Sequence, residues 1–196
     1  FPRVGDVSLN LSRISDPFLN KNMQVGIYTG RNKLSHIKDF KLKCSLLCHF
    51  VINRFVKSGK TYKAVDIDLH LKRMAENEHG ATFPVGIDEL PPSKVNKNKI
   101  KIYINSLLLD DEYNFLRTLA HELVHAKQYI LGELSYQKVG MVWKGQPTGF
   151  TFDGDMNWLE YYDFEWEIEA FGREEGLMVM FELFFKEFQK SISNNG

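Results

Sequence analysis

The sequence predicts an α+β fold in which a mostly antiparallel sheet packs on helices. Apolar residues recur with the helical period in separate stretches of the chain, and stretches of strict apolar–polar alternation lie between them. With 196 residues and 43% hydrophobic side chains, the chain is long enough for one domain with its own core. We expect this domain to span residues 35–196 and to follow an extended N-terminal arm of residues 1–34.

The arm mixes Gly, Asn, Ser and basic residues and shows no persistent hydrophobic period. It predicts an extended segment with one short strand at residues 24–28. Its apolar residues indicate that it lies against its own domain or against a partner. These residues are Phe1, Val4, Val7, Leu9, Leu11 and Phe18.

The first helix is expected over residues 35–58, where Ser35 can cap the start and Gly59 the end. Cys44 and Cys48 lie one helical turn apart in this stretch, and neighbours of this kind rarely form a disulfide. We interpret them as small buried side chains in a protein of a reducing compartment. The apolar positions with a 3.6-residue period are Ile37, Phe40, Cys44, Leu47, Cys48, Val51, Ile52 and Phe55.

Three strands are expected next. Residues 62–74 and residues 99–105 alternate between apolar and polar side chains, which is typical of a strand with one buried face. Residues 81–86 contain Pro84, which fits the edge of a sheet and not its centre. The apolar faces consist of Val65, Ile67, Leu69 and Leu71 in the first strand and Ile100, Ile102 and Ile104 in the last.

A second long helix is expected to begin after Asp110 or Asp111, either of which can cap it, and to end at Gly132. Residues 133–163 are loop-like apart from a short strand at residues 141–145. A connection of this length in a compact domain indicates a functional loop.

The last helix is expected to start near Asp163 or Phe164 and to run to about Ile192. Its second half, residues 177–188, is apolar almost all round. Such a helix is either enclosed in the core or offers an apolar face to another chain. We expect this Phe-rich stretch or the N-terminal arm to contact a partner protein or a second copy of the chain. The aromatic residues concerned are Phe181, Phe184, Phe185 and Phe188.

The second long helix carries the motif His-Glu-x-x-His, formed by His121, Glu122 and His125. Residues four apart on a helix lie about 40° apart around its axis and about 6 Å apart along it, so both imidazoles can bind one metal ion. Imidazole pairs suit zinc, and Glu122 can reach a metal-bound water. The alternative is an ordinary amphipathic helix with two partly buried histidines.

Two histidines leave a catalytic zinc short of its usual three protein ligands. No Cys or His follows His125, so an Asp or Glu must complete the site. The candidates are Glu165, Glu167 and Glu169, at the start of the last helix.

Residues 121–128 and 166–170 resemble the small gluzincin-type metallopeptidases encoded in tailed-phage genomes, and the resemblance covers roughly residues 60–176. It implies a zincin-like fold with a small, twisted sheet packed on helices, in which the edge strand, here residues 81–86, lines the cleft. It also implies Glu167 as the third ligand, because the metal-binding Glu of such enzymes precedes a helical Ala by three positions.

Two positions depart from the family pattern. Phe171 stands where related sequences often carry an Asp, so the carboxylate that supports the metal ligands is absent or comes from elsewhere. Glu165 stands where they often have a Pro that starts the helix, which predicts a solvated side chain.

The expected activity is zinc-dependent peptide-bond hydrolysis, with Zn²⁺ on His121, His125 and Glu167 and with Glu122 as the general base. One further donor stabilises the oxyanion. The candidates for that donor are Tyr161 and Tyr162, and also Tyr136.

Two other functions are compatible with the sequence. One is a structural protein of a virion or of its assembly that keeps the metallopeptidase fold and binds a partner through the arm and the apolar C-terminal helix. The other is a protease of DNA-bound proteins, but that class completes its zinc site with a His after the motif, which this chain lacks.

Net charge is zero, yet residues 1–101 carry 18 Lys and Arg against 9 Asp and Glu. Attraction between a basic and an acidic half explains this better than a nucleic-acid partner does. No run of eighteen apolar residues and no signal peptide is recognisable. Together with the resemblance to phage-encoded metallopeptidases, this leads us to expect a protein of the cytoplasm of an infected bacterial cell or of the virion, with a peptide or protein as its substrate.

Overall fold

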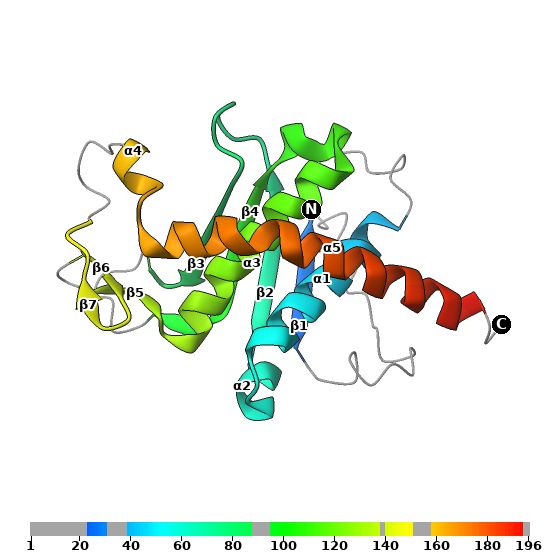
Figure 1. The fold of residues 1–196 in the computed structure, drawn as a ribbon, viewed down its shortest axis with the longest axis horizontal. Coiled ribbons are helices and arrows are strands. Elements are labelled where there is room, and N and C mark those ends of the chain that lie inside the picture. Colours follow the sequence, from blue (N-terminus) through cyan, green and yellow to red (C-terminus); the bar gives the residue numbers. More distant parts are fainter. Residues whose placement is uncertain (1–22, 31–38, 88–94, 138–139, 151–157, 194–196) are drawn as a thin grey trace, which may run out of the picture.

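The computed structural model describes residues 23–30, 39–87, 95–137, 140–150 and 158–193. Within these ranges the chain forms an α+β fold with a four-stranded sheet, a separate three-stranded sheet and helices packed against them (Figure 1). No helix in the described part of the chain is long and apolar enough to cross a membrane.

The four-stranded sheet has the order β1 (Gln24–Tyr28), β2 (Asp66–Lys72), β4 (Asn96–Asn105), β3 (Gly80–Val85). β1 and β4 both run parallel to β2, whereas β3 runs antiparallel to β4. The prediction of a mostly antiparallel sheet is therefore wrong for this sheet. The chain passes from β1 to β2 through the helices α1 (Phe40–Phe55) and α2 (Gly59–Lys63), so these two strands run in one direction. β4 shares this direction, and β3 adds to β4 as an antiparallel edge strand.

The strand expected within the N-terminal arm is β1, and it is hydrogen-bonded to β2 along its whole length. This part of residues 1–34 thus belongs to the sheet. The apolar residues expected to hold the arm in place, and the expected cap at Ser35, lie outside the described residues.

α1 (Phe40–Phe55) is the predicted first helix, and Cys44 and Cys48 are buried in it as free thiols, as expected. The helix ends before Gly59, which instead begins the short helix α2 (Gly59–Lys63). The cause is a local cap, because the side chain of Ser58 accepts a hydrogen bond from the backbone of Thr61. Residues 62–65 therefore precede β2 and do not extend it.

The sheet buries its alternating apolar face against the helices, as the period of two predicts. Ile67, Leu69, Ile102 and Ile104 are fully buried. A short 3₁₀ segment, η3 (Ser106–Asp110), then leads from β4 into the second long helix.

α3 (Glu112–Leu131) contacts α1, α5, β3 and β4 and is the central helix of the fold. Asp111 caps its start, accepting a hydrogen bond from the backbone of Asn114 over 3.1 Å. Gly132 ends it with φ at 74°, a left-handed conformation that favours glycine. Both predicted ends are confirmed.

The connection between the long helices is more ordered than predicted. It forms an antiparallel sheet of β5 (Leu134–Gln137), β6 (Gly140–Trp143) and β7 (Gln146–Pro147), followed by α4 (Trp158–Tyr161). The predicted strand at residues 141–145 corresponds to β6.

α5 (Glu165–Ser193) is the predicted last helix and crosses the molecule on the same side as α1 and α3 (Figure 1). Phe181 and Phe188 are buried, and Phe184 and Phe185 are half-buried against the core. These four rings pack within the chain. An apolar contact with a partner on this half of α5 would have to use the exposed side chains, which are Val179, Leu183 and Ile192.

Candidate metal centre

Three side chains from two helices converge on one point. His121 and His125 come from the middle of α3, and Glu167 comes from the first turn of α5. The two Nε2 atoms lie 3.2 Å apart, and the carboxylate oxygens of Glu167 lie 3.4 Å from the first and 3.3 Å from the second. Among the described residues, these three side chains form a group that could hold a metal ion, because their ligand atoms all lie within 4.8 Å of one another.

The approach of α5 to α3 depends on a small side chain. Ala170 follows Glu167 by three residues, so both project from the same side of α5. It is fully buried. A larger residue there would push the helices apart and withdraw Glu167 from the histidines.

The outer nitrogens of both rings are held by acceptors. The Nδ1 of His121 lies 2.9 Å from Oε2 of Glu174, and the Nδ1 of His125 lies 2.9 Å from Oε1 of Gln128. The amide of Gln128 cannot turn around, because its Nε2 donates to Glu169 and to the backbone carbonyl of Trp166. Each neutral imidazole therefore donates from Nδ1 and directs the lone pair of Nε2 into the centre.

Two lone pairs and a carboxylate at this separation repel one another unless a cation lies among them. Two imidazole nitrogens and one carboxylate oxygen make a donor set that suits zinc, and a site with three protein ligands leaves a position for water or substrate. The residues present therefore fit the metal that the motif predicts.

In the metal-free protein a proton takes the place of the cation. Burial alone would lower the pKa of His121, but hydrogen bonds to Glu167 and Glu174 outweigh it and raise that pKa to about 9. For Glu167 the effect of burial has the opposite sign and would raise the pKa, but the hydrogen bonds to His121 and His125 hold this pKa well below its usual range. The centre is thus built to balance a buried carboxylate with positive charge.

Glu122 lies beside the centre and is positioned by β3. Its side chain is buried, and its Oε2 accepts a hydrogen bond from Oγ1 of Thr82 over 2.7 Å. A Cβ at Gly80 would come within 2.6 Å of Oε1, so the absence of a side chain at that residue makes room for the carboxylate. Burial raises the pKa of Glu122, and the two histidines oppose that shift.

The three candidate third ligands have different surroundings. Glu165 is exposed to solvent, as expected for its place at the start of α5. Glu169 belongs to a cluster of ion pairs, 2.8 Å from both Lys127 and Arg173. Burial alone would raise its pKa, but Lys127 and Gln128 lower it to about 2. Glu167 is the one that faces both histidines.

The expected supporting carboxylate comes from a residue that sequence reasoning did not identify. Phe171 stands where the family resemblance leads us to expect an Asp, and it packs edge-on against the ring of His121, with centroids 4.5 Å apart. Glu174 supplies the carboxylate instead. It follows Glu167 by seven residues, two helical turns, and this spacing was the signal that could have indicated a shared face.

The three tyrosines considered as oxyanion donors differ in how close they lie to the metal centre. Tyr161, at the end of α4, donates its hydroxyl hydrogen to Oε1 of Glu167. Burial, followed by the charge of Glu167, raises the pKa of this phenol, so Tyr161 remains a donor. Tyr162 lines the same cleft but is half exposed, and its ring contacts Phe171. Tyr136 lies on β5 and packs against the core.

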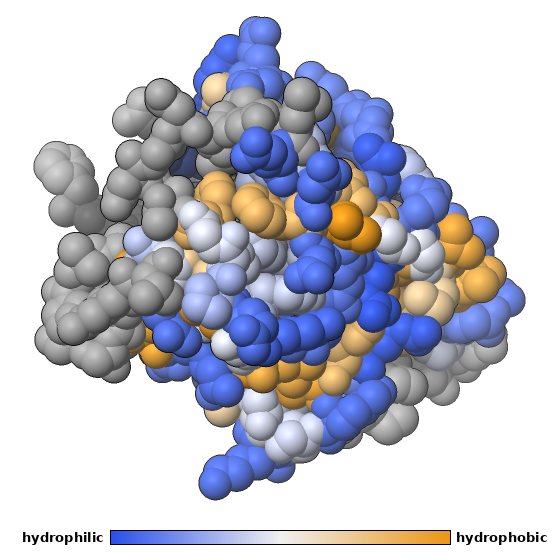
Figure 2. All heavy atoms as spheres, turned by 60° about the vertical axis from the view of Figure 1, so that its left-hand side comes forward, coloured by the Kyte–Doolittle hydropathy of each residue, from blue (hydrophilic) through white to orange (hydrophobic). Residues whose placement is uncertain are grey.

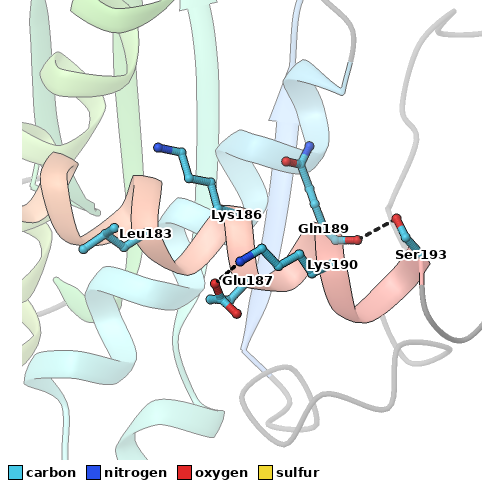
Figure 3. A pocket seen from close by; sticks show the side chains of 6 residues that line it. All are labelled: Leu183, Lys186, Glu187, Gln189, Lys190 and Ser193. Atoms are coloured by element: carbon cyan, nitrogen blue, oxygen red, sulfur yellow. Dashed lines mark hydrogen bonds and ion pairs between the residues drawn. The ribbon is translucent and has the colours of Figure 1, made fainter.

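The centre opens into a cleft of about 800 Å³ that extends along β3 and reaches α5 and the second sheet. Figure 2 turns this end of the molecule forward and shows apolar residues beside hydrophilic ones across it. A second depression, on the outer face of the C-terminal part of α5, is lined by exposed residues of that helix alone (Figure 3). No protein-family model, curated protein or solved structure matches the chain.

Proposed function

We propose that the chain hydrolyses peptide bonds with a zinc ion held by His121, His125 and Glu167. The observation that carries this proposal is that two imidazole nitrogens and the buried carboxylate of Glu167 converge on one point. A second buried carboxylate, that of Glu122, lies beside this point and is not one of the three proposed ligands. Burying a carboxylate is costly, and the hydrogen bond from Thr82 to Glu122 does not explain it, because a neutral acceptor would serve Thr82 equally well. The buried carboxylate of Glu122 therefore suggests a chemical role.

When bound, zinc supplies a Lewis acid that polarises the substrate carbonyl and lowers the pKa of a water molecule. Glu122 takes a proton from the water as the water oxygen forms a bond to the carbonyl carbon of the substrate. Glu122 then passes this proton to the nitrogen of the leaving amine, and the C–N bond breaks. A raised pKa suits both halves of this transfer. Tyr161 is the candidate donor to the developing oxyanion, because its hydroxyl already lies at Glu167.

β3 is the candidate support for the substrate backbone. It is the last strand in the order of the main sheet, so its outer edge has no strand partner among the described residues. The same strand lines the cleft from Gly80 to Val85. A substrate in extended form can add to such an edge through backbone hydrogen bonds.

Two measurements test the proposal. Protein purified without chelator should contain one zinc per chain, and less than about a tenth of an equivalent that added zinc does not restore would contradict it. Glu122→Gln should keep the zinc but lower the cleavage rate of a peptide library by about 10²–10⁴-fold, since that is the usual contribution of a general base. Glu165→Gln, an exposed carboxylate near the same site, should cleave at the parent rate.

A further inference from the structure

One wall of the cleft is apolar and adjoins the metal centre. It is contributed by the end of α3, by the connection between the long helices and by the start of α5. The residues of this apolar wall are Tyr129, Leu134, Met141, Phe150, Tyr161 and Trp166. Besides Glu122 and Glu167 at the centre, the charged side chains that line the described cleft are Lys72, Glu78, Lys101, Arg117 and Glu174, and the side formed by β3 carries further apolar residues, among them Phe83 and Val85.

The apolar wall lies next to the metal ligands in space as well as in sequence. Tyr129 follows His125 by four residues on α3, so it projects from the same face one turn further on. Trp166 precedes Glu167 directly, and the hydroxyl of Tyr161 bonds to that carboxylate. A substrate held at the metal centre therefore has this wall beside the bond to be cleaved.

Ring packing and backbone bonds hold the apolar wall in place. The backbone N–H of Met141 donates to the carbonyl of Phe150 over 2.9 Å, which ties the latter to the edge of β6. The ring of Phe150 meets Phe164 edge-on at 5.4 Å, and Phe164 stacks on Trp166 at 4.3 Å. The wall is thus formed before any ligand arrives, which lowers the entropic cost of binding.

We propose that the apolar wall receives a large apolar side chain, aromatic or aliphatic, of the substrate residue next to the cleaved bond. The inference rests on the proposed function and names its substrate class, peptides with such a residue at one side of the scissile bond. It also assigns a role to the long connection between the helices, whose small sheet places Leu134 and Met141 in the cleft.

The test measures binding without turnover. Zinc-loaded Glu122→Gln protein is titrated calorimetrically with short N-acetylated peptide amides that differ at one residue, which is Phe, Leu, Ala or Asp and is moved along the peptide. At one position Phe and Leu should bind roughly tenfold or more tightly than Ala, and Asp more weakly still, because burying a large apolar side chain has about this effect. Equal affinities, or no binding of any peptide, would overturn the inference.

A pair of matched variants locates the preference. Phe150→Ala should reduce the advantage of Phe over Ala several-fold, whereas Phe150→Leu should retain most of it. Phe184→Ala is the control, because Phe184 is also a half-buried aromatic residue but lies on α5 against Phe50. A preference that Phe150→Ala and Phe184→Ala leave equally unchanged would place the apolar side chain elsewhere and sink the assignment.

The outcome separates this inference from the proposed function. If the zinc-loaded parent protein cleaves none of the peptides but the Glu122→Gln variant binds them with the expected preference, the proposed hydrolysis is contradicted and the proposed binding by the apolar wall is supported. If the parent cleaves peptides without regard to apolar side chains, hydrolysis stands and the inference fails.

Discussion

The two halves of α5 carry similar residues but use them differently. In the first half, Glu167 and Glu174 have side chains that are 2% and 13% exposed and bind the histidines of α3. In the second half, Glu187 and Lys190 are 72% and 69% exposed and pair with each other (Figure 3). Buried charge requires partners from another element, and α3 supplies them to the first half alone. The first half therefore contributes to the candidate metal centre, and the second half stabilises the fold through its aromatic face.

The strongest test of this difference is the removal of the proposed third ligand. Glu167→Ala should weaken zinc binding by roughly a thousandfold or more, since it deletes one of the three protein ligands. Glu165→Ala, two residues earlier and exposed, should not change it, and Glu169→Ala should change it far less. Competition with a chromogenic chelator measures all three. A Glu167→Ala protein that holds zinc as firmly as the parent would overturn the assignment.

The second half of α5 should respond in stability and not in metal binding. Phe181 is 2% exposed and packs against Phe50 of α1, with ring centroids 5.9 Å apart. Phe181→Ala should lower the free energy of unfolding by about 3 kcal/mol, because it removes a buried ring and leaves a cavity. Leu183→Ala, on the exposed side of the same helix, should change it little. Urea titration measures both, and equal effects would refute the contrast between the two faces.

Glu174 should tune the metal without binding it. Glu174→Gln keeps the shape but removes the negative charge at Nδ1 of His121, and loss of such a partner usually costs 10–100-fold in metal affinity. The visible spectrum of the cobalt-substituted protein should shift, since the ring orientation and basicity change. Glu175→Gln, the exposed neighbour, is the control. An unchanged affinity and spectrum would show that the carboxylate is incidental.

The metal-free protein should lose stability as the pH rises from about 6.5 to 9. His121 has a folded pKa of about 9 against an ordinary value of 6.5, so the folded state binds more protons than the unfolded state in this range. The contribution is fully present below pH 6.5 and is lost as the pH passes through about 9, with an expected size of at least about 1 kcal/mol. Thermal unfolding of the chelator-treated protein measures it. His121→Asn should make the profile shallower without removing it, because burial would lower the pKa of His125 but its contact with Glu167 raises that pKa as well. A parent protein that becomes more stable over this range would contradict the assignment.

The smallest effect is expected at the exposed ion pair of the second half. Lys190→Ala should change the free energy of unfolding by less than about 0.5 kcal/mol, because a solvent-exposed pair three residues apart contributes little. Zinc affinity should not change at all. A loss of more than about 1 kcal/mol in denaturant titration would mean that the pair does more than the geometry indicates.

The sequence predicted those features that depend on local chemistry. The caps at Asp111 and Gly132 are set by residues within one turn, and the alternation in β2 and β4 is set by burial of one face. The direction of pairing was not accessible, because an alternating strand has the same pattern whether its neighbour is parallel or antiparallel. The correction of the main sheet has this cause.

The candidate site shows the same division. The spacing of His121 and His125 placed both on one face without any knowledge of the fold. Glu165, Glu167 and Glu169 could not be ranked by spacing alone, since the choice depends on which face of α5 meets α3, and a family resemblance made the selection. Glu174 was missed because its role depends on that same face.

The contact between Gly80 and Glu122 sets a limit on how the protein can change. Strand and carboxylate are fitted so closely that one methyl group at Gly80 would displace the side chain of Glu122, while the strand itself keeps its hydrogen bonds to β4. A single added carbon atom would thus change the position of the Glu122 carboxylate without disrupting the sheet. A chain with any other residue at this position could therefore keep the fold and the three proposed metal ligands while losing the placement of Glu122 on which the proposed hydrolysis depends.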